Sequence, residues 1–168
     1  MRIYLIGFMG VGKSTVGKCL AEELNFEFID TDELIEKDLG LSIFKIFEKL
    51  GEKEFRKLEK TILKKVSKKK NVVISTGGGL PCFNNNMQYI NNHGVSVLIK
   101  MYWAEYFGKL SKLKKSRPLL NLKNKEDVIR FVRELWLDRF PIYKQANHHI
   151  FNNDTPEMVA KRIVRKLS

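Results

Sequence analysis

The sequence has few cysteines, and neither is placed for chemistry. Cys19 falls in a helical pattern and Cys82 follows a glycine run, with no metal-ligand spacing around either. We therefore expect two reduced thiols without a catalytic role, the usual state of free cysteines. The three histidines form no metal-ligand set either, and we assign them packing or surface roles.

Long apolar segments are also absent from the sequence. No window approaches the roughly 20 consecutive apolar residues that a bilayer span requires. The N-terminus reads Met-Arg-Ile-Tyr-Leu-Ile-Gly, which lacks the basic segment, apolar core and cleavage site of a signal peptide. The composition, 43% hydrophobic and 30% charged, is ordinary for one soluble domain. We expect an uncleaved, monomeric cytoplasmic protein that forms a single domain over residues 1–168.

Acidic residues are scarce relative to basic ones, and the formal net charge is +12. Such an excess calls for a polyanionic partner to be considered, either nucleic acid or ATP. The lysine run over residues 64–70 has little aromatic interleaving and is typical of a solvated helix end. No basic, aromatic-rich face or nucleic-acid motif is recognisable, so we expect no nucleic-acid partner. A lysine-rich proteome would give the same charge without any partner.

Short apolar runs alternate with longer helical patterns along the whole chain. This alternation predicts an α/β fold with a parallel sheet, in which buried strands read as continuous apolar runs. The predicted strands cover residues 3–6, 26–29, 72–75, 95–101 and 149–151. The basic stretch from about residue 109 to 125 lacks periodic apolar residues, so we expect a mobile lid there.

The first predicted strand leads into a phosphate-binding motif. Residues 7–14 read Gly-Phe-Met-Gly-Val-Gly-Lys-Ser, which fits G-x-x-x-x-G-K-[ST] between a strand and a helix. The glycines let backbone N–H groups face phosphate oxygens, Lys13 offers a charge to the β- and γ-phosphates, and Ser14 can ligate Mg²⁺. The ATP-binding residues predicted here are Gly10, Val11, Gly12, Lys13, Ser14 and Thr15. A purely structural glycine-rich turn is the alternative.

Two acidic residues follow the second predicted strand. A conventional Walker B strand ends in an acid, yet residues 72–76 lead into glycines, so the carboxylate near the metal must come from elsewhere. The carboxyl ends of parallel strands line the ligand crevice of such sheets. This places Asp30 to hold Mg²⁺ or its water and Asp32 to accept the proton of an attacking hydroxyl. Alternatively, Asp32 only caps the next helix.

Three consecutive glycines, residues 77–79, end a central strand and leave backbone donors free to meet a substrate. The alternative is a tight turn from strand to helix. Arg56 lies beside the inward face of a helix, where Glu59 is close enough to pair with it. A solvated surface arginine is the alternative for Arg56.

Together these segments resemble the shikimate kinase family, in order and over nearly the whole chain. The resemblance is carried by the P-loop, Asp30-Thr31-Asp32, Gly51-Glu52 with Phe55-Arg56-x-x-Glu59, Gly77-Gly78-Gly79, Arg117-Pro118-Leu119-Leu120 and Arg139-x-Pro141-x-Tyr143. It implies a three-layer P-loop kinase fold with a five-stranded parallel sheet. It also implies transfer of the γ-phosphate of ATP, with Mg²⁺, to the 3-hydroxyl of shikimate, in the biosynthesis of chorismate and aromatic amino acids.

The resemblance also implies roles for individual residues. Shikimate contacts fall to Asp32, Arg56, Gly78 and Arg139, while Arg117 on the lid reaches the nucleotide. Asp32, Lys13 and Arg117 would be catalytic, and Ser14 and Asp30 would hold Mg²⁺. The set makes chemical sense, because guanidinium groups suit the carboxylate of shikimate and a carboxylate suits its hydroxyls.

The sequence departs from the family pattern at the lid. The family usually carries an arginine seven residues before its Arg-Pro-Leu-Leu motif, and here that position is Leu110. Lys109 or Lys112 is a partial substitute for contact with adenine. Two other functions are open at this stage: a P-loop kinase for gluconate or a nucleoside monophosphate, and a basic NTP-dependent nucleic-acid-binding protein.

Overall fold

The computed structural model describes residues 1–114 and 124–167; for residues 109–114 and 125 the description is limited to the backbone. Five parallel strands form one sheet in the order β2-β3-β1-β4-β5. The strands are β1 (Arg2–Ile6), β2 (Glu27–Asp30), β3 (Val72–Ser75), β4 (Val95–Lys100) and β5 (His148–Phe151). The predicted parallel sheet is confirmed.

The middle of the sheet is its most buried part. In β1, Ile3, Tyr4, Leu5 and Ile6 have no exposed surface. Strand β1 pairs with β3 through Arg2 to Leu5 and with β4 through Ile3 to Ile6. Because helices cover both faces, these strands carry apolar side chains at consecutive positions. Because β1, β2 and β3 run parallel, their carboxyl ends lie at the same edge of the sheet.

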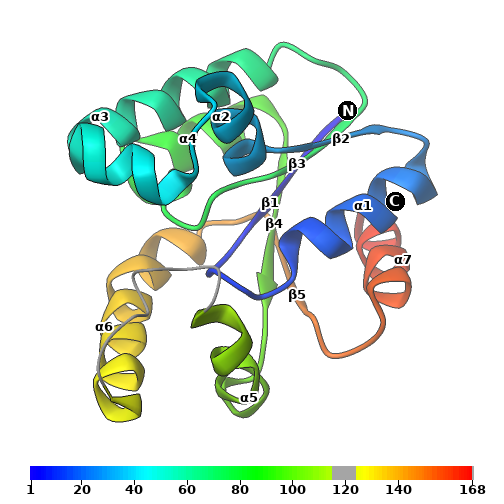
Figure 1. Ribbon diagram of the computed structural model, residues 1–168. Helices are drawn as coiled ribbons and strands as arrows, with labels where there is room; N and C mark the ends of the chain where they lie inside the picture. The colour runs from blue at the N-terminus through cyan, green and yellow to red at the C-terminus, as the bar shows by residue number, and fades with distance from the viewer. Residues whose placement is uncertain (115–123, 168) are drawn as a thin grey trace.

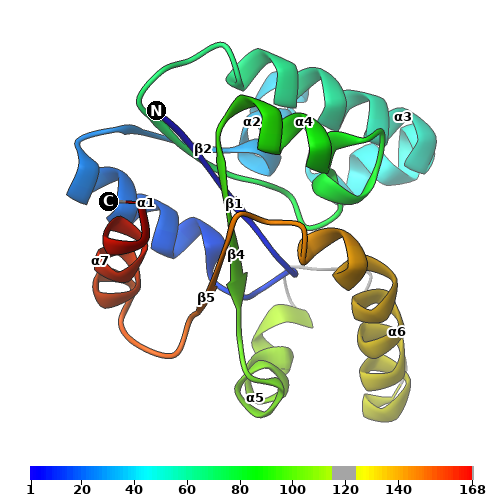
Figure 2. The ribbon, with the colours of Figure 1, turned by 180° about the vertical axis from the view of Figure 1, so that it is seen from behind.

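Helices cover both faces of the sheet (Figures 1 and 2). On one face α1 packs against α7, while α3 and α4 lie on the other face. The helices are α1 (Lys13–Leu24), α2 (Thr31–Leu39), α3 (Ile43–Val66), α4 (Asn86–His93), α5 (Trp103–Lys114), α6 (Lys125–Tyr143) and α7 (Pro156–Leu167), with a 3₁₀ turn η1 (Leu80–Cys82). These layers give the P-loop kinase fold expected from the sequence.

Glycine and serine set the helix boundaries around α3. Gly40 ends α2 with a left-handed φ of 65°, and the hydroxyl of Ser42 accepts a hydrogen bond from the backbone N–H of Lys45 at the start of α3. Gly51 interrupts the helical geometry with φ 74° and ψ 170°. The two helical segments on either side of Gly51 therefore form one kinked element.

Helix α5 was not predicted, and it extends into the segment in which a mobile lid was expected. The backbone of residues 109–114 continues α5, whereas an irregular segment was expected from residue 109. The helical signal was present upstream, because Trp103, Tyr106 and Phe107 recur at the i, i+3, i+4 spacing and their rings pack together. Residues 115–123 of the predicted lid, including Arg117, lie outside the described residues, as does the side chain of Leu110.

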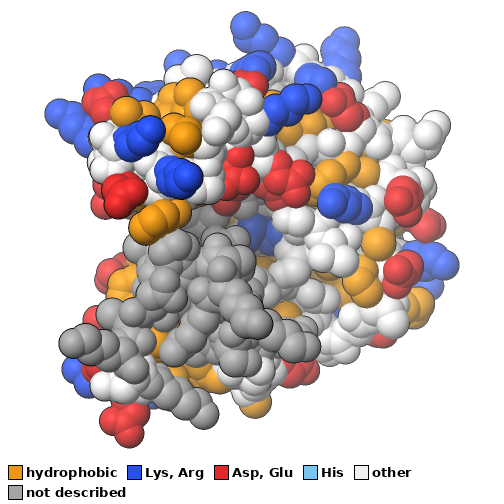
Figure 3. All heavy atoms as spheres, in the orientation of Figure 1, with side chains coloured by type: hydrophobic (Ala, Val, Ile, Leu, Met, Phe, Trp, Pro, Cys, Tyr) orange, Lys and Arg blue, Asp and Glu red, His pale blue; other side chains and the backbone are white. Residues whose placement is uncertain are grey.

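The basic surface is interspersed with acidic side chains (Figure 3). Within the lysine run near the end of α3, Lys65 pairs with Asp38 at 2.9 Å and Lys69 pairs with Glu27 at 2.7 Å. The predicted solvated helix end therefore includes ion pairs with α2 and β2. Across residues 1–114 and 124–167, no helix combines the length and apolarity needed to cross a membrane.

Candidate active site

The phosphate-binding loop lies between β1 and α1, as the motif requires. Lys13 is almost buried, with 7% of its surface exposed, and its Nζ donates to the backbone oxygens of Gly7 at 2.9 Å and Phe8 at 2.8 Å. Gly12 precedes α1, and its carbonyl accepts the first helical bond, from the N–H of Val16. The loop therefore holds a cation beside the positive end of a helix dipole, an arrangement suited to phosphate.

Ser14 and Asp30 lie together at the start of α1 and the end of β2. The hydroxyl of Ser14 donates to Oδ2 of Asp30 at 2.6 Å and lies 3.4 Å from the hydroxyl of Ser75. Hydroxyl and carboxylate oxygens are the hard ligands that Mg²⁺ prefers, and Mg²⁺ commonly adds substrate phosphates to one or two carboxylates. Among the described residues, no cluster of three or more His, Cys, Asp or Glu could hold a metal. Ser14 and Asp30 therefore fit a metal site in which the protein supplies some of the ligands and a bound nucleotide supplies the others.

Asp30, rather than Asp32, caps helix α2. Its Oδ1 accepts hydrogen bonds from the backbone N–H groups of Asp32 at 3.0 Å and Glu33 at 3.4 Å. Asp32 therefore lies in the first turn of the helix, and the alternative in which it serves as the cap is wrong. Its carboxylate lies beside Gly77, at the end of the neighbouring strand β3.

The three glycines after β3 are each in contact with a different charged side chain. A Cβ atom would meet a carboxylate at the first position and a guanidinium at each of the other two. The pairs are Gly77 with Asp32, Gly78 with Arg139 and Gly79 with Arg56. A side chain at 77 or 79 would therefore displace its partner. The segment also turns tightly, since the N–H of Leu80 donates to the carbonyl of Gly77, as the tight-turn alternative requires. A contact between these glycines and a substrate stays a prediction.

This group of charges borders the phosphate-binding loop. A Cβ on Gly78 would lie 3.4 Å from both Nη1 of Arg139 and the backbone nitrogen of Met9, and 3.7 Å from the carbonyl oxygen of Gly7. The N–H of Gly77 donates to the hydroxyl of Thr31 at 2.9 Å, which joins β3 to the first residue of α2. The fold thus places a mixed carboxylate and guanidinium site directly beside the P-loop.

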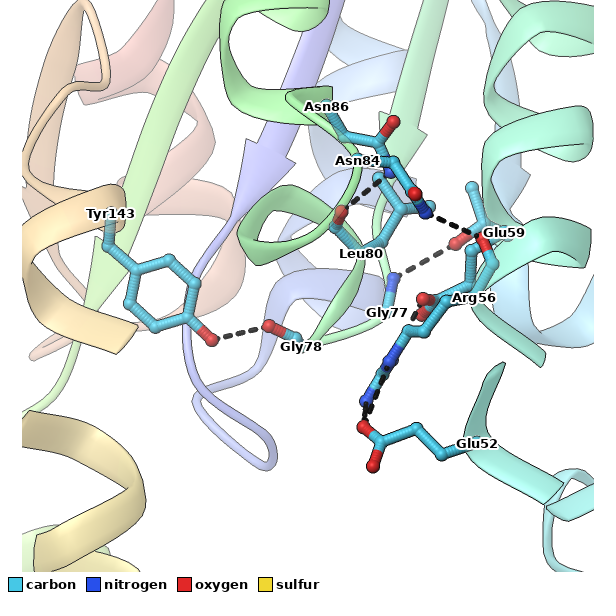
Figure 4. A network of polar contacts seen from close by, with 10 residues as sticks. Glu52, Arg56, Glu59, Gly77, Gly78, Leu80, Asn84, Asn86 and Tyr143 are labelled. Atoms are coloured by element: carbon cyan, nitrogen blue, oxygen red, sulfur yellow. Dashed lines mark hydrogen bonds and ion pairs between the residues drawn. The ribbon is translucent and has the colours of Figure 1, made fainter. Parts of the chain in front are cut away.

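Arg56 is held in place by two carboxylates, which Figure 4 shows, and by the ring of Phe83. It pairs with Glu59 at 2.8 Å and with Glu52 at 2.9 Å, and its guanidinium lies 4.0 Å from the centre of the Phe83 ring. Only 11% of its side chain is exposed. The predicted pairing with Glu59 is confirmed, and the alternative of a solvated surface arginine is wrong.

Glu59 is a buried acid with an altered proton affinity. Burial raises the pKa of its carboxyl to about 7, although the neighbouring Arg56 favours the charged form. The charges of Asp32 and Arg139 also act on Glu59. Its ionisation is therefore coupled to the same group of charges.

Replacing Glu59 with Gln tests this burial. A raised pKa means that the folded state holds the proton more tightly than the unfolded chain, so ionisation costs stability as pH rises from 4.5 towards about 7. We expect the Tm of the wild type to fall relative to that of Glu59→Gln between about pH 5 and pH 8. Thermal unfolding across this range checks it; a Tm difference that does not change with pH would contradict the assignment.

Tyr143 was part of a sequence motif but had no predicted role. It is fully buried, and its hydroxyl donates a short hydrogen bond to the carbonyl of Gly78 (Figure 4). Burial raises the pKa of this hydroxyl above the ordinary value, although the charge of Arg139 lowers it, so it stays a donor. Burial also raises the pKa of the neighbouring Cys82 thiol to about 11, which makes it a poor nucleophile.

Comparison with known proteins identifies the family. The sequence model described as "Shikimate kinase" matches residues 9–168 of this chain. The chain belongs to the shikimate kinase family. A shikimate kinase of Aquifex aeolicus is 45% identical over 167 residues, covering 99% of this chain and 96% of the relative. Another, from Caldanaerobacter subterraneus, is 46% identical over 97% of this chain and 94% of its own length.

Solved structures of the shikimate kinase family agree with this fold. The enzyme from Bacteroides thetaiotaomicron has a TM-score of 0.93 at 37% identity, covering 99% of this chain and 98% of its own. A shikimate kinase from Acinetobacter baumannii, solved in complex with shikimate, has a TM-score of 0.88 at 36% identity and covers 99% and 92%. Membership of the shikimate kinase family makes this chain an ATP-dependent kinase and favours this function over the gluconate, nucleoside monophosphate and nucleic-acid alternatives.

Proposed function

We propose that the chain transfers the γ-phosphate of ATP to the 3-hydroxyl of shikimate, giving shikimate 3-phosphate and ADP, with the residues assembled around Gly77 to Gly79 as the acceptor site. One observation carries the residue assignment: successive glycines are in contact with Asp32, Arg139 and Arg56, directly beside the P-loop. A hydroxylated carboxylic acid needs this combination of one acceptor and two guanidinium donors.

The two arginines would bind the carboxylate of the substrate. Guanidinium groups form paired, charge-assisted hydrogen bonds with carboxylates. Arg139 lies beside Gly78, and Arg56 already has its orientation set by Glu52 and Glu59. Little side-chain freedom is then lost when shikimate binds, which favours affinity.

Asp32 would orient the 3-hydroxyl and accept its proton. Phosphoryl transfer depends mainly on in-line positioning and on neutralising charge. Asp32 lies on α2 beside Gly77, while the P-loop residue Met9 lies beside Gly78. An alcohol held by Asp32 would therefore face a triphosphate held by the P-loop.

Ser14 and Asp30 would hold Mg²⁺, and Lys13 would neutralise charge on the β- and γ-phosphates. When bound, the metal would supply positive charge to balance the negative charge that develops on the phosphates. The proposal for Ser14 and Asp30 is supported by their 2.6 Å contact at the start of α1. Arg117 enters the proposal as a catalytic nucleotide contact on the family resemblance alone. Because all these residues belong to one chain, we expect a monomer.

An acceptor comparison tests the proposed function. ADP release by the purified protein, with ATP and Mg²⁺, should be stimulated strongly by shikimate. Gluconate, nucleoside monophosphates and single-stranded DNA or RNA should leave ADP release at its background rate. Phosphorylation of another acceptor at a higher kcat/KM than shikimate would refute the assignment.

A further inference from the structure

Asn152 connects the end of β5 to the phosphate-binding loop. It directly follows β5, and its backbone N–H donates to the carbonyl of Lys100 at 2.7 Å. Its side-chain Nδ2 donates to the carbonyl of Val11 at 2.8 Å, across 141 positions of the sequence. A residue outside the P-loop motif thus bonds the backbone of the loop directly.

This bond fixes the orientation of the peptide unit between Val11 and Gly12. In a trans peptide the C=O of one residue and the N–H of the next point in opposite directions. By holding the carbonyl of Val11, Asn152 directs the N–H of Gly12 to the opposite side. Gly12 has φ 92°, and a Cβ there would collide with Nδ2 of Asn152. The amide therefore packs directly on the glycine whose N–H it orients.

The segment that carries Asn152 is itself anchored. Nη2 of Arg162, on α7, donates to the carbonyl of Phe151 at 3.0 Å and to Oδ1 of Asn153 at 2.9 Å. Helix α7 packs in turn against α1, which begins in the P-loop. Asn152 is therefore held from both sides by the sheet and by α7.

We propose that Asn152 is a positioning residue for phosphate binding: it holds the Val11–Gly12 peptide so that the N–H of Gly12 faces a phosphate oxygen of ATP. The inference rests on the proposed function for its nucleotide, and it adds a residue that the P-loop motif does not contain. It acts on the phosphates rather than on the base. This role differs from that of a residue that contacts the base of the nucleotide.

Binding measurements on Asn152→Ala test the proposal. We expect calorimetric Kd values for ADP and for base-free tripolyphosphate, with Mg²⁺, to rise about fivefold each, the effect of losing one hydrogen bond. The KM for ATP should rise by the same factor, while the KM for shikimate stays unchanged. Asn152→Asp removes the donor and adds negative charge, so its loss should be larger than that of Asn152→Ala.

Asn147→Ala is the matched control, at the other end of β5. The Oδ1 of Asn147 accepts hydrogen bonds from Ser96, at 2.9 Å from its backbone N and 3.0 Å from its Oγ. Its replacement should lower the Tm and leave both Kd values as in the wild type. This control separates loss of strand stability from loss of phosphate binding.

Two outcomes would overturn the role of Asn152. One is wild-type affinity of Asn152→Ala for both anions; the other is weaker binding of ADP with unchanged binding of tripolyphosphate, which indicates a base contact. If Asn152→Ala does not fold, Asn152→Ser, which adds no charge, decides by the same two measurements. The binding of ADP and of tripolyphosphate is measured without shikimate. If shikimate is not the acceptor, only the ADP-release assay would therefore show it.

Discussion

Asp32→Asn should lower kcat by about a hundredfold to ten-thousandfold, the usual contribution of general acid–base catalysis. Asparagine has nearly the same shape as aspartate and keeps an oxygen that can orient a hydroxyl beside Gly77, but it cannot take up the proton. Because Asp32 does not cap α2, the helix should form as in the wild type. Steady-state kinetics with shikimate, together with calorimetric binding of ADP, measure both effects. The Kd for ADP should not change.

Asp38→Asn is the matched control for this variant. Asp38 lies on the same helix, is 41% exposed and pairs with Lys65 on the surface. Its replacement should leave kcat and both KM values near those of the wild type, since exposed ion pairs contribute little. If Asp32→Asn kept a kcat within a few-fold of the wild type, Asp32 would only orient the substrate.

Arg139→Ala should raise the KM for shikimate by about tenfold to a hundredfold and leave the KM for ATP unchanged. The estimate follows from the roughly 1.5–3 kcal/mol that hydrogen bonds to charged groups contribute. Arg139 lies beside Gly78 and is only partly buried, so the variant should remove one side of the proposed carboxylate site without emptying a core position. Initial rates with each substrate varied in turn give both KM values.

Two further arginine variants test whether the effect of Arg139→Ala comes from the loss of its guanidinium group at this position. Arg139→Lys keeps the charge but loses the planar pair of donors, so its KM should fall between those of the wild type and Arg139→Ala. Arg130→Ala, on the same helix, replaces a side chain that is 68% exposed and should change neither KM. A normal KM for shikimate in Arg139→Ala would place the substrate carboxylate elsewhere.

The parts of the site that are local in sequence could be predicted. The P-loop motif fixes its own position between a strand and a helix, and Glu59 lies three positions after Arg56 on a helix, so their contact follows from helix geometry. The parallel sheet predicted that Asp30 and the glycines would meet at one edge. Each of these predictions depends on the regular backbone geometry of a helix or of a parallel sheet.

Contacts between distant segments could not be read from the sequence. The bond from Tyr143 to Gly78 spans 65 positions and that from Asn152 to Val11 spans 141. The local sequence around Tyr143 or Asn152 does not predict its hydrogen-bond partner, because helix packing and the order of the strands determine which residues meet. The position of Asn152, at the carboxyl end of a strand, was the one available signal.

The two carboxylate oxygens of Asp30 have different roles: one stabilises the start of a helix, and the other lies at the proposed metal site. Oδ1 accepts from the first turn of α2, while Oδ2 accepts from Ser14. Any replacement of Asp30 would therefore alter a helix start along with the proposed metal ligand, and its phenotype would mix folding with catalysis. The proposed metal site is better tested by mutation at Ser14, whose hydroxyl contacts Asp30 and Ser75 and caps no helix.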